Sequence, residues 1–125
     1  MARRRALLLE DDVALRELLL EAFAGEDIEV RICETFAEVR EAARLREADI
    51  VIADFWGGSQ RTLPQSDRDD IRELASYLPV ILLTGRTWAA DTSAEELGAR
   101  ALIRKPFDLD DLLRTVEDVV GDRQA

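Results

Sequence analysis

Several side chains able to do chemistry follow directly after short apolar runs of the sequence. They are two carboxylates after Leu7–Leu9, one after Ile50–Ala53, a hydroxyl after Val80–Leu83 and an ammonium after Leu102–Arg104, namely Glu10, Asp11, Asp54, Thr84 and Lys105. If these runs are neighbouring parallel strands, their carboxyl ends meet at the edge where open α/β sheets bind ligands. The sequence therefore predicts that these groups share one crevice.

Three carboxylates in one crevice repel one another. At about 4 Å and an effective dielectric near 20, each like-charge pair costs about 4 kcal/mol, so either one group is protonated or a cation binds among them. Oxygen ligands favour Mg²⁺, which needs only one or two carboxylates and also accepts water, carbonyl or phosphoryl oxygens. Lys105 can pair with Asp54 or with a phosphoryl group, and the Thr84 hydroxyl can donate to a phosphoryl oxygen.

The intervening segments have the apolar period and the caps of helices. They predict helices from Asp12 to a stop at Gly25, from a capping box at Thr35–Glu38 to Glu47, over Ser66–Tyr77, over Thr92–Leu97 and from Asp108 to Gly121. The alternation over Ile28–Cys33 predicts an exposed edge strand, whereas fully apolar runs predict strands buried on both faces. Because no helical period is present over 85–90, we expect the fourth helix to be short or mobile.

Strands and helices alternate along the whole chain. This order predicts an α/β fold with a doubly wound, five-stranded parallel sheet of strand order 2-1-3-4-5, which is flavodoxin-like. Strands 1 and 3 then lie side by side, which brings Glu10 and Asp11 next to Asp54.

Composition narrows the class of protein. A chain of 125 residues fits one domain, and a net charge of −10 disfavours direct nucleic-acid binding. One cysteine, Cys33, and no histidine exclude an intrachain disulfide, the usual zinc sites and Ser/His or Cys/His nucleophile pairs. No apolar run approaches the roughly 20 residues of a membrane span, and the start of the chain lacks the apolar core of a signal peptide. We expect a cytoplasmic protein without a membrane partner.

These residues resemble the receiver domains of two-component response regulators over nearly the whole chain. The motifs that carry the resemblance are Leu7–Asp12, Asp54, Pro79–Thr84, Gly98–Ala99 and Lys105–Phe107, with spacings of 30 positions from Asp54 to Thr84 and 21 from Thr84 to Lys105. The resemblance implies that Asp54 accepts a phosphoryl group, that Glu10 and Asp11 are the acidic pair for Mg²⁺, that Thr84 is the switch hydroxyl and that Lys105 contacts the phosphoryl group. It further implies that the backbone carbonyl of Trp56 is a metal ligand and that the Lys105–Pro106 bond is cis.

The resemblance also implies a function. Asp54 takes a phosphoryl group from a phosphohistidine on a histidine kinase or histidine phosphotransfer protein in a Mg²⁺-dependent reaction, so the chain catalyses only its own phosphorylation and dephosphorylation. The face formed by the fourth helix, the fifth strand and the fifth helix is the expected surface for a downstream protein. Residues 1–125 are expected to be a single receiver domain without an output domain, present as a monomer or weak dimer.

Some positions depart from the pattern of that family. Leu102 occupies the position three before the lysine, where an aromatic residue is usual, and Gly85 replaces a common alanine after Thr84. We therefore expect a softer switch element and no aromatic switching in its usual form. The segment 55–64 is expected to be an exposed connection, and Trp56 and Arg86 are expected to tune the lifetime of the phosphoryl group.

Two alternatives come from other functional classes. A pseudo-receiver would bind a partner without being phosphorylated, with Leu102 and the unusual segment 55–64 as signs of drift. A small phosphatase or hydrolase of the haloacid-dehalogenase pattern would need a second aspartate two residues after the first, and Trp56 stands at that position.

Overall fold

The computed structural model describes residues 4–54, 65–85 and 93–124. Strands and helices alternate within these ranges, and the sheet has the order β2-β1-β3-β4-β5 with every neighbouring pair parallel. The elements are β1 (Arg4–Leu9), α1 (Val13–Gly25), β2 (Ile28–Cys33), α2 (Phe36–Arg44), β3 (Ile50–Ala53), α3 (Gln65–Tyr77), β4 (Val80–Thr84), α4 (Ala94–Leu97), β5 (Ala101–Arg104) and α5 (Leu109–Gln124). The predicted fold class and strand order are confirmed.

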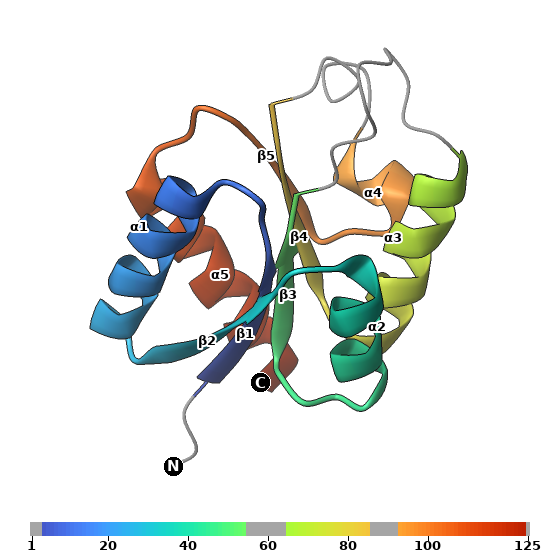
Figure 1. Ribbon diagram of the computed structural model, residues 1–125, viewed down its shortest axis with the longest axis horizontal. Coiled ribbons are helices and arrows are strands. Elements are labelled where there is room, and N and C mark those ends of the chain that lie inside the picture. Colours follow the sequence, from blue (N-terminus) through green and yellow to red (C-terminus); the bar gives the residue numbers. More distant parts are fainter. Residues whose placement is uncertain (1–3, 55–64, 86–92, 125) are drawn as a thin grey trace.

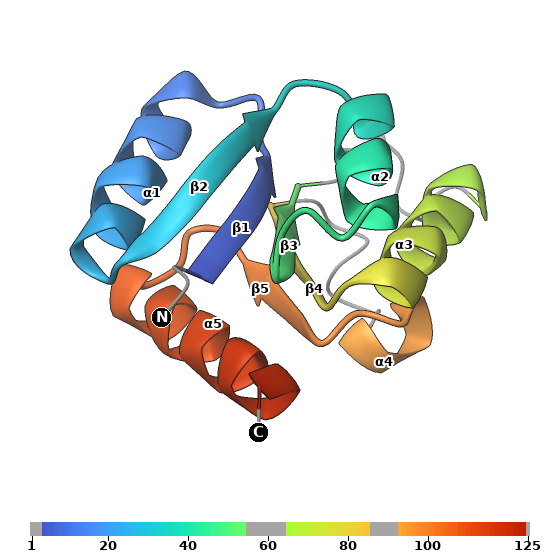
Figure 2. The same cartoon turned by 90° about the horizontal axis from the view of Figure 1, so that it is seen from below.

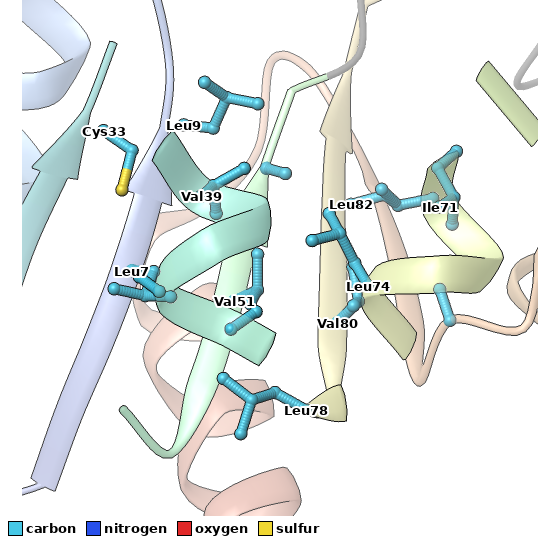
Figure 3. Packing of buried hydrophobic residues seen from close by; sticks show 14 of the residues in the cluster. Leu7, Leu9, Cys33, Val39, Val51, Ile71, Leu74, Leu78, Val80 and Leu82 are labelled. Atoms are coloured by element: carbon cyan, nitrogen blue, oxygen red, sulfur yellow. The ribbon is translucent and has the colours of Figure 1, made fainter. Parts of the chain in front are cut away.

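Helices cover both faces of the sheet. Helices α1 and α5 lie on one face and α2, α3 and α4 on the other (Figures 1 and 2). Successive strand residues point to opposite faces, so Leu8 and Ile52 pack towards α1 and α5, whereas Leu7 and Val51 pack towards α2 to α4. The buried residues thus form one apolar cluster on each face. Figure 3 shows the cluster between the sheet and α2 to α4, in which Val39 of α2 lies over the sheet. Burial on both faces explains the uninterrupted apolar runs of β3 and β4.

Local hydrogen bonds set the starts of two helices. The Asp12 carboxylate accepts a hydrogen bond from the Leu15 amide at 3.1 Å, which caps α1. The Thr35 hydroxyl accepts one from the Glu38 amide at 3.2 Å, as expected for a capping box. The second hydrogen bond of a capping box would run from the Thr35 amide to the Glu38 carboxylate. Here the Glu38 carboxylate accepts a hydrogen bond from the Glu34 amide instead, at 3.3 Å.

Several helix bounds were predicted wrongly. Helix α1 ends at Gly25, as predicted, but α5 runs past Gly121, since Gly121 does not have the left-handed φ with which glycine usually ends a helix. Helix α3 starts at Gln65, so Ser66 lies inside its first turn. Helix α2 ends at Arg44, before the predicted Glu47.

The short fourth helix is confirmed. Helix α4 has 4 residues, between an N-cap at Ser93 and a C-cap at Gly98 with φ of 81°. A side chain is strained at that φ, which is why glycine is required there. Across the described ranges, no helix is both long enough and apolar enough to cross a membrane.

Adjacent leucines on α1 provide a test of the packing. Leu19 is fully buried between α1 and the sheet, whereas its neighbour Leu18 is 49% exposed. We predict that Leu19→Ala lowers the free energy of unfolding by about 2–5 kcal/mol because it leaves a cavity. The matched change Leu18→Ala should alter it by at most about 0.5 kcal/mol. Urea denaturation followed by circular dichroism measures both, and equal losses would contradict the assignment of the α1 core face.

Candidate phosphoryl and metal site

The acidic residues meet where β1 and β3 end. Glu10 and Asp11 follow β1, and Asp54 follows β3, which pairs directly with β1. The Asp54 amide donates to the Leu9 carbonyl at 2.9 Å, which fixes the backbone of Asp54 against β1. One carboxylate oxygen from each of Glu10, Asp11 and Asp54 lies within 4.8 Å of the others. The predicted cluster is therefore present at the carboxyl edge of the sheet.

Lys105 reaches this cluster from the other side of β4. Its Nζ donates to Glu10 Oε2 at 2.8 Å and to Asp54 Oδ2 at 2.9 Å. The side chain of Glu10 is fully buried and that of Asp54 is 10% exposed, so little water screens these ion pairs. A compact ammonium can approach two carboxylates from one nitrogen atom, which a planar guanidinium does less readily.

Burial and charge shift the pKa values in this cluster. Burial of the Glu10 carboxylate is the largest effect and raises its pKa, and the nearby Asp54 adds to the rise despite the opposing hydrogen bonds from Lys105 and the Asp12 amide. Burial alone would lower the pKa of Lys105, but its hydrogen bonds to Glu10 and Asp54 outweigh that effect and raise the pKa. Lys105 therefore keeps its positive charge at neutral pH.

The charges of the cluster fit a divalent cation. With all groups ionised, three carboxylates and one ammonium leave a net charge of −2. Asp11 is exposed, and its carboxylate has no hydrogen bond or ion pair with any described residue. Carboxylate oxygens are hard ligands suited to Mg²⁺. The residues present therefore fit a magnesium ion held by Glu10, Asp11 and Asp54.

Thr84 lies at the same edge of the sheet as Lys105. It is the last residue of β4, is 1% exposed and stands opposite Arg104 in the register between β4 and β5. Its carbonyl accepts a hydrogen bond from the Lys105 amide at 2.7 Å. A Cβ at Gly85 would lie 3.6 Å from the Lys105 Cβ, which is an ordinary contact, so an alanine would fit there as well.

Leu102 takes the place in β5 where the family resemblance predicts an aromatic residue. It pairs with Leu82 of β4 and packs, half-buried, against the apolar cluster on the α2 to α4 face. The side chain is therefore part of the packing between β5 and that cluster.

Of the remaining predictions from the family resemblance, one can be compared with the structure and the others cannot. The Lys105–Pro106 bond is cis, as the family resemblance implied. Trp56, Arg86 and the segment 55–64 lie outside the described residues, so their predicted roles stay predictions.

One ion pair was not predicted from the sequence. Lys105 was expected to pair with Asp54, but Glu10 was expected only as a metal ligand. One feature of the sequence sets Lys105 apart and could have indicated a second partner for it: Lys105 is the only lysine among the 17 basic residues of the chain. A chain that otherwise uses arginine has its single compact ammonium in this site.

The single lysine allows a direct test of the ion pairs. In protein labelled with ¹³C-lysine, one side-chain signal reports Lys105, and we predict a pKa above the ordinary value of about 10.4. Glu10→Gln should lower this pKa, whereas Glu47→Gln, which removes the partner of Arg31 far from Lys105, should not. NMR titration measures all three; equal values in the wild type and Glu10→Gln would contradict the Glu10–Lys105 pair.

The same pairs predict how stability changes with pH. Because folding raises the pKa of Lys105, its charge stabilises the fold below the unfolded-state pKa, and this stabilisation is lost as the pH rises through the folded-state pKa. Lys105→Met should therefore reduce the loss of stability seen at alkaline pH. Urea denaturation over that range provides the measurement.

The chain also matches known proteins. The family model described as the response regulator receiver domain matches residues 6–117. The chain is 30% identical to the DNA-binding transcriptional regulator NtrC of Escherichia coli over 129 residues, which cover 99% of this chain and 26% of NtrC. It thus spans about a quarter of the length of this relative.

Solved structures agree with this match. The beryllofluoride-activated NtrC receiver domain is similar with a TM-score of 0.69 and 27% identity, and all of both chains is covered. The receiver domain of the sensor histidine kinase PA1611 from Pseudomonas aeruginosa, solved with magnesium in its active-site cleft, has the same fold, with a TM-score of 0.73, 20% identity and coverage of 96% of this chain and 99% of that one. Together with the arrangement of Glu10, Asp54 and Lys105, the family match shows that this chain belongs to the response regulator receiver domains of two-component systems.

Proposed function

We propose that the chain accepts a phosphoryl group on Asp54 in a Mg²⁺-dependent reaction and that this modification changes its binding to a partner. The observation that carries this proposal is the position of the Lys105 Nζ, which binds both Glu10 and Asp54 beside the exposed carboxylate of Asp11. An acceptor carboxylate, a cation site and a fixed ammonium are the groups that phosphoryl transfer to an aspartate needs.

The transfer itself needs few groups from the chain. A carboxylate oxygen of Asp54 attacks the phosphorus of a phosphohistidine, the P–N bond breaks, and the departing imidazole keeps the electron pair and takes a proton from water. Lys105 already binds an oxygen of Asp54, so its ammonium can bind an oxygen of the phosphoryl group attached there. The Thr84 hydroxyl donates to another of these oxygens, which makes the end of β4 respond to phosphorylation.

The metal site is proposed with the same residues. Glu10, Asp11 and Asp54 would hold the Mg²⁺ through their carboxylates, and the backbone carbonyl of Trp56 would add a further ligand. When bound, Mg²⁺ would neutralise charge on the transferring phosphoryl group. The closeness of the three carboxylate oxygens supports this assignment, as does the magnesium ion in the related PA1611 receiver domain.

The partners follow from the proposed reaction. The phosphodonor would be a histidine kinase or a histidine phosphotransfer protein, and the downstream partner would be a protein that binds the face formed by α4, β5 and α5. We propose that the chain acts as a cytoplasmic monomer or weak dimer and catalyses only its own phosphorylation and dephosphorylation. Although NtrC is a DNA-binding regulator, a net charge of −10 argues against DNA binding by this chain itself.

The pseudo-receiver alternative is not favoured. A protein that no longer accepts a phosphoryl group does not need a buried glutamate and a lysine held at the acceptor, yet both are in place. Leu102, which suggested such drift, has a packing role in β5.

The central prediction is a phosphoryl adduct on Asp54. Incubation with Mg²⁺ and acetyl phosphate should add the mass of one phosphoryl group, as measured by intact-mass spectrometry, and Asp54→Asn should abolish the adduct. Asp11→Asn should strongly reduce the rate because it removes a metal ligand.

The matched control for Asp11→Asn is Asp12→Asn, since Asp12 caps α1 and asparagine caps helices equally well. This variant should be phosphorylated at close to the wild-type rate. An adduct that persists in Asp54→Asn, or no adduct with any phosphodonor, would contradict the proposal.

A second prediction concerns the lifetime of the adduct. Trp56 stands two positions after the acceptor, and we propose that its indole excludes attacking water from the phosphoryl group. Trp56→Asn should therefore speed dephosphorylation, and Trp56→Phe should change it less because an aromatic ring is kept. Loss of the adduct over time, followed by intact mass, provides the measurement; an unchanged lifetime in Trp56→Asn would refute the idea.

A further inference from the structure

Helix α4 is a single helical turn that depends on other parts of the fold. Within the turn, the Ser93 hydroxyl accepts from the Glu96 amide at 3.2 Å, and the amides of Gly98 and Ala99 donate to the carbonyls of Glu95 and Ala94 at 3.1 and 3.0 Å. Such a short helix is not stable by itself, because the cost of nucleation exceeds the gain from so few hydrogen bonds. Contacts with the rest of the fold must therefore hold it.

Helix α3 supplies a contact of this kind. The Arg72 Nη2 donates to the carbonyl of Glu96 at 2.9 Å, which provides a partner for a backbone acceptor in the last turn of α4. The aliphatic stem of Arg72 lies close to Gly98, where a Cβ would be 3.7 Å from the Arg72 Cγ. A cation also suits this position, because the C-terminal end of a helix carries partial negative charge.

Apolar packing joins the same two helices. Leu97 of α4 is fully buried and belongs to the cluster that contains Ile71 and Leu74 of α3. Figures 1 and 2 both show α4 beside α3. The two helices therefore form one unit, in which the Arg72–Glu96 hydrogen bond is the polar link and Leu97 the apolar one.

The unit of α3 and α4 is connected through the chain to two residues of the site, Asp54 and Thr84. Among the described residues, α3 is the first helix after Asp54 and α4 the first after Thr84. A displacement of Thr84 towards a phosphoryl group on Asp54 acts on α4 through the chain, whereas the hydrogen bond from Arg72 resists movement of α4 relative to α3.

We propose that Arg72 is a positioning residue that holds α4 against α3 while Lys105 binds the unmodified carboxylate of Asp54, and that phosphorylation weakens this contact. The inference rests on the proposed function and adds a residue that controls how readily the switch moves. A contact shifts an equilibrium only if it differs between the two arrangements. Loss of the contact must then favour the modified arrangement, and by reciprocity it must tighten binding of a phosphoryl analogue.

The test uses beryllofluoride, which activated the related NtrC receiver domain. Arg72→Met keeps most of the aliphatic stem and removes the donor. It should raise the hydrogen-exchange rates of the Gly98 and Ala99 amides about threefold or more without beryllofluoride, and lower the Kd for beryllofluoride by about threefold, as expected for the loss of one exposed hydrogen bond. NMR measures both quantities on the same samples.

Two further variants separate coupling from general destabilisation. Arg72→Lys keeps a charged donor and should restore both values towards those of the wild type. Arg114→Met removes an exposed arginine of α5 that pairs with Asp111 in its own helix, and it should change neither value.

The outcomes are distinct. If Arg72→Met speeds exchange in α4 but leaves the Kd for beryllofluoride unchanged, the contact is only structural and the coupling is refuted. An unchanged exchange rate overturns the role of Arg72 in holding α4. If the wild-type chain shows no Asp54-dependent binding of beryllofluoride, the proposed function fails and the coupling fails with it.

Discussion

The site depends on electrostatic repulsion among three carboxylates and on the ammonium that offsets part of it. Glu10 and Asp54 are buried at the ends of adjacent strands, where water cannot stabilise their charges well. Lys105 binds both of them and so offsets part of the repulsion between the buried carboxylates. The cluster still keeps a net negative charge, which suits a divalent cation. Burial that strengthens these ion pairs would also strengthen the contacts of Lys105 with an attached phosphoryl group.

The sheet makes this arrangement possible because its strands are parallel and buried on both faces. Their apolar residues are shared between two helical layers, which leaves the carboxyl ends of the strands as the place for polar groups. The hydrogen bond from the Asp54 amide to the Leu9 carbonyl and that from the Lys105 amide to the Thr84 carbonyl fix these ends pairwise. Side chains on a sheet edge that is fixed in this way keep their relative positions, which the proposed phosphoryl transfer would require.

The elements that would report a change at this edge are built differently. Helix α4 is a single turn that contacts α3 through the Arg72 hydrogen bond and through the packing of Leu97. Leu102 of β5 packs against the apolar cluster on the same face of the sheet. Within the part of the chain that the structure describes, a few contacts hold α4, and elements held by few contacts are the ones that small free-energy changes can move. The rigid site and the lightly held helix are thus complementary parts of one fold.

The sequence by itself determined the fold class, the strand order and the residues that would meet at the sheet edge, because apolar periodicity and strand-end position are local properties of the chain. It did not determine where α5 ends, which is past Gly121, since whether a glycine takes a left-handed φ depends on the residues after it and on the packing around it. The pairing of Lys105 with Glu10 and the reach of Arg72 to Glu96 were decided only by the tertiary structure. The partners are 95 positions apart in the first hydrogen bond and 24 in the second. A long side chain can reach several groups, and only the packing of the sheet and helices decides which of them lies within hydrogen-bond distance.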